Sequence, residues 1–156
     1  MKKLLLLLTL VSPVLALAQA PTPDAPPAVN FCGIDLVVPG GCTPDNKYQV
    51  HCQGMQLTWM YLDYPMLKGF PDQFVRQLEK KHKHTEKQPL ECFILETPAK
   101  GYRLSYPTEA GGMTYELVAY GIAKGQPVMV QVTLETDPDK TADLPALAQQ
   151  IIRLPK

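Results

Sequence analysis

The four cysteines are the side chains of this chain with the widest chemistry: Cys32, Cys42, Cys52 and Cys92. A cysteine can act as a nucleophile, ligate a metal or form a disulfide. Zinc sites usually use close C-x-x-C pairs, and this spacing does not occur here. We therefore expect two structural disulfides, given a chain that folds in an oxidising compartment.

The spacing of the cysteines leaves three pairings open, and the sequence alone does not choose between them. We favour Cys32–Cys42 together with Cys52–Cys92. The first bridge would close a short loop through residues 39–41, and the second would tie two β-patterned segments across the core. Cys32–Cys52 together with Cys42–Cys92 is the next choice.

Histidines and acidic residues offer weaker metal sites. His82 and His84 stand at positions i and i+2, which point to different sides of a helix. The acidic run over residues 135–143 lacks the glycine and the distal glutamate of an EF-hand loop. We expect neither a metal nor a cofactor.

Catalytic side chains are hard to assemble from this sequence. Ser105 lies in YRLSYP and not in a G-x-S-x-G elbow. Glu91, Glu96 and Glu116 could in principle form a carboxylate pair for glycoside cleavage, but glutamates on strands are far more often plain surface residues. No glycine-rich phosphate loop occurs. We therefore expect a protein that is not an enzyme.

Residues 1–18 have the layout of a secretory signal peptide. Two lysines precede an apolar stretch over residues 4–17, and small residues follow at Ala16, Ala18 and Ala20. We favour cleavage after Ala18, because a cut after Ala20 would place a proline next to the scissile bond. The stretch is shorter than the roughly 20 residues that span a bilayer. We expect export to the periplasm of a Gram-negative cell, without stable membrane insertion after cleavage.

The remaining chain has the composition of one domain behind a short leader. Residues 19–30 carry four prolines and are expected to be a disordered leader. Residues 31–156 then form a single domain. Removal of two signal-peptide lysines leaves 13 Lys and Arg against 15 Asp and Glu, a net charge of −2. This balance gives no reason to expect nucleic acid or an anionic membrane as a partner.

Apolar residues at every second position predict strands. The segments with this pattern are residues 34–38, 48–52, 55–61, 90–94, 102–106, 113–119 and 128–134. Turn-rich links over 98–101, 107–112 and 123–127 predict antiparallel hairpins.

Two segments have helical periodicity. One covers residues 71–83, with Pro71 and Asp72 in its first turn. The other covers residues 143–153, with Asp143 as the N-cap. The fold class is therefore predicted as α+β: an antiparallel sheet of about six to seven strands in the order β-β-β-α-β-β-β-β-α, with two helices packed on it.

The most apolar stretch after the leader covers residues 53–67. A strand that is apolar on both faces either is covered twice, which we favour, or has one face that awaits a partner. Aromatic residues are enriched at interface hot spots. We therefore select these candidate partner-binding residues from this stretch and from the turns: Trp59, Tyr61, Tyr64, Lys100, Tyr102, Glu109 and Lys124.

Two stretches resemble known folds. Tyr48-x-x-x-Cys52 followed by QGMQLTWMYL is similar to the opening strands of periplasmic C-type lysozyme inhibitors. The two predicted helices do not fit the all-β barrel of that family. The long hairpin and final helix at the end of the chain resemble the last part of the PsbP-like fold, a likeness of layout that carries no functional residues.

An exported domain that is stabilised by disulfides and has no recognisable group of catalytic residues is typical of a binding protein. We expect an immunity or inhibitor protein that sterically blocks a toxin or an envelope-degrading enzyme. The alternative is a non-catalytic accessory or assembly module of a cell-envelope or secretion complex. In both cases the partner is a protein.

Overall fold

The computed structural model describes residues 28–155, and the predicted signal peptide and the leader up to residue 27 lie outside this range. Its strands are β1 (Ala28–Phe31), β2 (Ile34–Val37), β3 (Cys42–Asn46), β4 (Gln49–Cys52), β5 (Met55–Tyr61), β6 (Glu86–Ile94), β7 (Thr97–Pro107), β8 (Met113–Ala123), β9 (Gln126–Leu134) and β10 (Ile152–Arg153). Its helical elements are the 3₁₀ helices η1 (Tyr64–Lys68) and η2 (Thr141–Asp143) and the α-helices α1 (Phe70–Lys81) and α2 (Ala146–Gln149).

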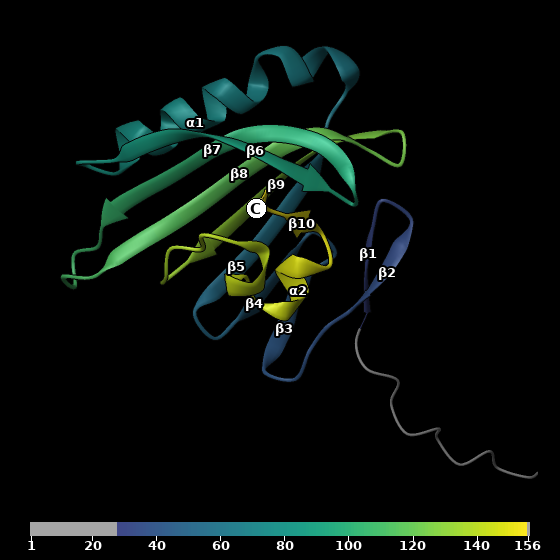
Figure 1. Cartoon of the computed structure of the whole chain (residues 1–156), viewed down its shortest axis with the longest axis horizontal. Helices are drawn as coiled ribbons and strands as arrows, with labels where there is room; N and C mark the ends of the chain where they lie inside the picture. The colour runs from purple at the N-terminus through teal and green to yellow at the C-terminus, as the bar shows by residue number, and fades with distance from the viewer. Residues whose placement is uncertain (1–27, 156) are drawn as a thin grey trace, which may run out of the picture.

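Eight of the strands form one curled antiparallel sheet in the order β10-β6-β7-β8-β9-β5-β4-β3, and β1 and β2 form a separate two-stranded ribbon (Figure 1). The predicted α+β class is therefore wrong: strands make up 52% of the structure, and only one of the two expected disulfides is present. None of the helices in residues 28–155 has the length and apolar character needed to cross a membrane.

The structure has three strands that were not predicted, β1, β3 and β10, and β7 is longer than predicted because one expected turn lies inside it. Residues 98–101 have turn composition, yet they continue β7 and pair with β6, with Pro98 opposite Phe93. The pairing of β7 with β8 begins only at Lys100, so Pro98 needs no hydrogen bond on that side. Position 101 of β7 requires glycine because there is no space for a side chain. A Cβ on Gly101 would lie 1.8 Å from the carbonyl oxygen of Val118.

The helix predicted over residues 71–83 is confirmed as α1. Its buried Val75 and half-buried Phe70, Phe74 and Leu78 pack against the sheet, where they meet residues such as Val118. This apolar stripe recurs with the helical period, so the local sequence is enough to predict it.

The second predicted helix, over residues 143–153, is wrong. The structure has the short η2 and α2 there, followed by β10. Ile152 pairs with Ile94 of β6 and continues the sheet. β-branched side chains favour strands over helices, and a free sheet edge on β6 is available to them. The apolar residues of this segment are buried as expected, but only Leu147 and Ala148 are buried by a helix, the short α2.

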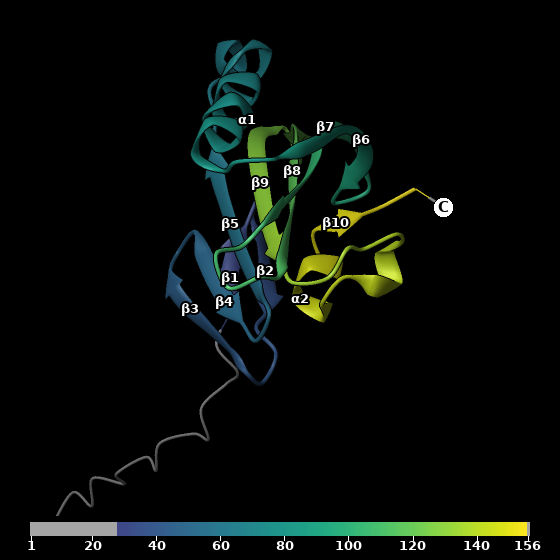
Figure 2. The same cartoon turned by 90° about the vertical axis from the view of Figure 1, so that its left-hand side faces the viewer.

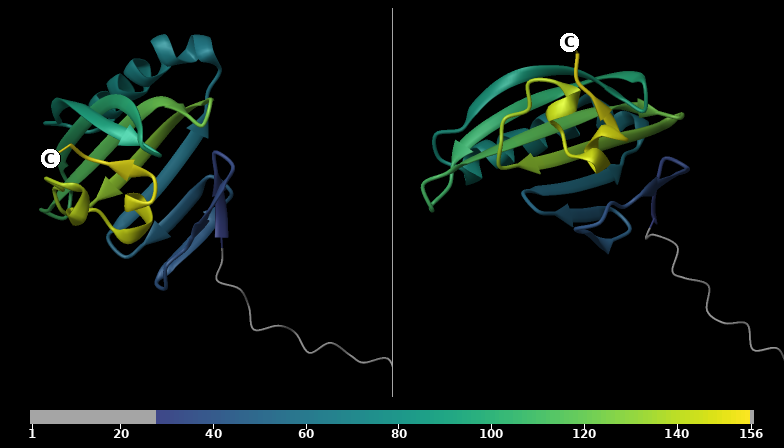
Figure 3. Two further views of the ribbon diagram at one scale, coloured as in Figure 1. Left: turned by 45° about the vertical axis from the view of Figure 1, so that its right-hand side comes forward. Right: turned by 60° about the horizontal axis from the view of Figure 1, so that its bottom comes forward.

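The sheet is covered on both faces, and α1 and α2 lie on opposite sides of it (Figure 2). We call these sides the α1 face and the α2 face. The ribbon β1–β2 covers the α2 face together with α2, as the views in Figure 3 show. The Nε2 amide of Gln150 donates a hydrogen bond of 3.0 Å to the carbonyl of Val37 and so links the C-terminal segment to the ribbon.

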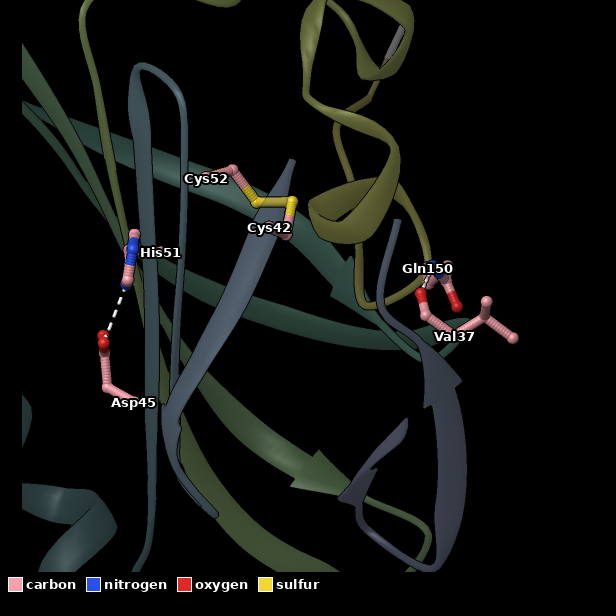
Figure 4. The surroundings of a disulfide bond; sticks show 6 residues. All are labelled: Val37, Cys42, Asp45, His51, Cys52 and Gln150. Atoms are coloured by element: carbon pink, nitrogen blue, oxygen red, sulfur yellow. Dashed lines mark hydrogen bonds and ion pairs between the residues drawn. A yellow bond between two sulfur atoms is a disulfide. The ribbon is translucent and has the colours of Figure 1, made fainter. Parts of the chain in front are cut away.

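The disulfide joins Cys42 to Cys52, which are direct partners across β3 and β4 (Figure 4). Cys32 and Cys92 are free thiols, so the favoured pairing of Cys32–Cys42 and Cys52–Cys92 is wrong. Two separate hairpins explain the difference: Cys32 forms the tip of β1–β2 with Gly33, whereas β3–β4 brings Cys42 and Cys52 together. Burial in the core raises the pKa of Cys92 to about 11.

Candidate functional site

A groove with a volume of 720 Å³ opens on the α1 face near the start of α1. Pockets of about 300–1,000 Å³ are the usual size for small ligands, and they also accommodate anchoring side chains. The groove lies between η1 and the first turn of α1 on one side and β7 and β8 on the other. It is lined by Leu67, Lys68, Asp72, Thr97, Pro98, Ala99, Lys100, Tyr120, Gly121 and Ile122.

Successive side chains of β7 and β8 point to alternate faces of the sheet, and those on the α1 face form one side of the groove. Lys100 and Tyr120 are direct partners across these strands and therefore share the α1 face. The Nζ of Lys100 lies 5.8 Å from the centre of the Tyr120 ring. Tyr120 is nearly buried, whereas Ile122, two residues further along the same face, is 40% exposed. The groove is thus apolar at its base and charged at its rim.

The other side of the groove depends on η1, which is fastened at two points. The hydroxyl of Tyr64 donates a hydrogen bond of 2.8 Å to the carbonyl of Gly125, in the turn between β8 and β9. The backbone N–H of Leu62 donates to the carbonyl of Pro127 at 2.9 Å. The first contact joins η1 itself to the end of the sheet, and the second fixes the chain just before η1, so the edge beside the groove is held in place before any partner binds.

Asp72 places a carboxylate in the groove, but this carboxylate already has a partner. The hydroxyl of Tyr102 donates a hydrogen bond of 2.7 Å to Asp72 Oδ1. This hydrogen bond, with a smaller effect of burial, raises the pKa of Tyr102 to about 12. Lys68 and Lys100 form no ion pair with any residue in the range 28–155. Glu91 of β6 stands across from Lys100 in the sheet.

The structure brings some of the predicted binding residues together at the η1 end of the sheet. Tyr64 is 58% exposed on η1, and Lys100 lines the groove. Lys124 forms the β8–β9 turn together with Gly125, directly beside the Tyr64 hydrogen bond. Tyr102 lies behind the groove, where it is half-buried beside Asp72.

Other predicted binding residues lie elsewhere. Trp59 is 2% exposed in the core of the α2 face and does not reach the surface. Tyr61 lies at the end of β5, and its hydroxyl accepts the backbone N–H of Cys32 at 2.8 Å. Glu109 lies in the link between β7 and β8, at the opposite end of β8 from Ile122.

The residues of η1 and of the α1 face of β8 that form the groove are not among those predicted from the sequence. Tyr120 and Ile122 alternate with the core residues of β8, so this strand is apolar on both faces over much of its length. That pattern is a signal that could have been found. From the sequence, Asp72 is expected only in the first turn of a helix, because a sequence does not show that its carboxylate meets Tyr102.

The three glutamates considered for catalysis do not come together. Glu96 forms an ion pair with Arg153 at 3.0 Å. Glu116 is buried on β8 and accepts a hydrogen bond from the Tyr106 hydroxyl at 2.5 Å. Glu91 lies across β7 from Tyr120, four residues along β8 from Glu116. Four residues of a strand span about 13 Å, too far for a carboxylate pair.

The two histidines considered as metal ligands have different surroundings. The ring of His82 stacks on Tyr106, with the ring centres 3.8 Å apart. His84 is exposed in the link that follows α1. Within residues 28–155, no cluster of three or more His, Cys, Asp or Glu side chains is arranged to hold a metal ion.

Comparison with known proteins adds no further assignment. The chain matches no protein-family model and none of the curated proteins with which it was compared.

Proposed function

We propose that this chain is an exported inhibitor that covers the active-site cleft of a toxin or envelope-degrading enzyme, with the groove and its η1 rim as the contact surface. The observation that carries the proposal is a group of exposed apolar side chains beside the groove. Tyr64 is 58% exposed, Met66 37% and Ile122 40%. Tyrosine and methionine are enriched at protein interfaces, and exposed apolar groups beside a pocket are typical of binding sites.

The mechanism is steric. The turn at Lys124 and Gly125 forms a projecting edge, and the hydrogen bond from Tyr64 holds it against η1. A rigid edge loses little conformational entropy on binding, which favours affinity. An anchor side chain of the enzyme would enter the groove while this edge covers the cleft.

Export is part of the same proposal. The Cys42–Cys52 disulfide supports folding in an oxidising compartment, because cytosolic proteins rarely keep such bonds. The layout of residues 1–18 supports a cleaved signal peptide.

Exposure of cells to sibling cells that carry the toxin tests the inhibitor function. Deletion of the gene should make cells sensitive, and the wild-type gene should restore resistance. Ile122→Glu should fail to restore it, because a charge replaces an apolar contact at the rim. Met113→Glu is the matched control, since Met113 is 42% exposed at the other end of the same strand, β8. A deletion strain that stays fully resistant, or full protection by Ile122→Glu, would exclude this function.

Affinity purification from periplasmic extract identifies the partner. The wild-type chain should retain one enzyme that Ile122→Glu loses and Met113→Glu keeps. Retention of membrane components in place of an enzyme would favour the accessory or assembly module instead.

A further inference from the structure

The outward side of α1 is a basic surface that the proposed inhibitory contact does not use. The helix directs its apolar residues to the sheet and lies outermost on its face (Figure 2). Arg76, Lys80 and Lys81 are exposed on the helix, and Lys83 is exposed directly after it. We call these four residues the α1 basic surface.

The two acidic residues of α1 do not neutralise this surface. Asp72 accepts the Tyr102 hydroxyl at the groove, and Glu79 forms an ion pair with Lys87 at 2.8 Å. Within residues 28–155, none of the four basic residues forms an ion pair. Glu86, exposed at the start of β6, is the remaining acidic residue of this stretch of the chain.

The charge of the molecule is strongly divided. Residues 76–87 contain five Lys and Arg against two Glu, a net charge of +3. The rest of the range 28–155 contains seven Lys and Arg against twelve Asp and Glu, a net charge of −5. A partner with negative charge is therefore attracted to the α1 basic surface and repelled by the net charge of the remaining described residues, which orients the encounter.

We infer that the α1 basic surface docks an acidic protein surface on the partner, an inference that rests on the proposed function for the existence of that partner. The chemistry of the helix favours a protein over a membrane. A helix that binds a bilayer inserts its apolar face, and the apolar residues of α1, such as Val75 and Phe74, already pack on the sheet. The outward side offers charge alone, which suits carboxylates on a protein.

A binding assay with polyglutamate tests the charge preference without the partner. Lys80→Glu/Lys81→Glu should weaken binding at least about tenfold, because each change reverses a charge. The matched control is Lys47→Glu/Lys140→Glu, which makes the same change at two exposed lysines outside α1 and should weaken binding less than about twofold. Raising the salt concentration from about 50 to about 500 mM should abolish the difference.

Vesicles of phosphatidylglycerol form the second arm of the assay. The inference is overturned if both double variants bind polyglutamate equally. It is also overturned if vesicles bind more tightly than polyglutamate and lose binding in Lys80→Glu/Lys81→Glu, since this result would make the surface a membrane contact.

Kinetics with the purified partner separate this inference from the proposed function. At low salt, Lys80→Glu/Lys81→Glu should lower the association rate at least about tenfold, because steering is lost. Ile122→Glu should act mainly on the dissociation rate. An association rate that does not change in Lys80→Glu/Lys81→Glu overturns the inference and leaves the inhibitor intact. If no partner enzyme exists, the inhibitor fails, and the polyglutamate assay still decides the charge preference.

Discussion

The two faces of the sheet differ in how completely they are closed. On the α2 face, Trp59 and Leu57 of the sheet and Phe31 of the ribbon are at most 2% exposed. On the α1 face, a single long helix covers a smaller set of buried residues and leaves the groove open at its start. The closed face supplies most of the apolar burial, which leaves the α1 face free to keep an exposed apolar rim.

The faces also differ in how they treat polar groups. On the α1 face, the buried Glu116 accepts hydrogen bonds from Tyr106 at 2.5 Å and from Gln131 at 3.0 Å. On the α2 face, the indole N–H of Trp59 has no hydrogen-bond partner among the described residues. An unpaired buried donor lowers stability, so the large apolar area of the tryptophan must outweigh this loss.

The largest expected effect is on the closed face. Trp59→Ala should lower the free energy of unfolding by about 3–5 kcal/mol, because it leaves a cavity among Phe31 and its neighbours. Urea unfolding followed by circular dichroism measures this. Ile122→Ala at the open rim should change stability by less than about 0.5 kcal/mol. Equal effects of the two changes would contradict the difference between the faces.

The disulfide should come next. Replacing Cys42 and Cys52 by serine should lower the free energy of unfolding by about 2–3 kcal/mol, because the unfolded chain regains the freedom of a loop of ten residues or so. Urea unfolding of the wild type in reducing agent should give the same loss. Cys32→Ser is the control and should keep the full effect of reducing agent, since Cys32 is a free thiol. A reducing agent without effect on the wild type would show that the bond adds no stability.

The buried hydrogen bonds of the α1 face should have a smaller effect. Tyr106→Phe removes one donor to the Glu116 carboxylate and should cost about 1.5–3 kcal/mol, the range for hydrogen bonds to charged groups. Tyr64→Phe is the control, because its hydroxyl bonds a neutral carbonyl at the surface. Urea unfolding measures the loss of stability in both variants. Similar losses would show that the buried hydrogen bond stabilises the fold no more than the surface one.

The smallest effect concerns alkaline pH. The hydrogen bond to Asp72 raises the pKa of Tyr102 to about 12, and burial first, then Glu116, raises the pKa of Tyr106. Folding therefore favours the neutral phenols, a contribution that is complete below the unfolded pKa of about 10. It should decline as the pH rises from about 10 through 12.

Absorbance at alkaline pH measures the ionisation of the tyrosines in this range. Asp72→Asn removes the negative charge and should lower the pKa of Tyr102 towards its ordinary value. An unchanged titration in Asp72→Asn would show that Asp72 does not control this group.

Only part of the fold and little of the candidate site could be predicted from the sequence. The strand segments 55–61 and 128–134 match β5 and much of β9, because alternation with period two is a local property. The groove could not be predicted in the same way. It joins Lys68, Lys100 and Ile122 from three elements, and no pattern within one element shows which others it meets.

The sequence by itself determined α1 and the antiparallel hairpins with links over 107–112 and 123–127, because an apolar stripe and short links act within a few residues of chain. Only the tertiary structure decided the cysteine pairing and the end of the chain. Cys42 meets Cys52 because of the register of β3 on β4, and Ile152 extends the sheet because the edge of β6 is free. Both outcomes depend on which segments lie side by side, a choice that the whole core makes through the burial of its apolar surface.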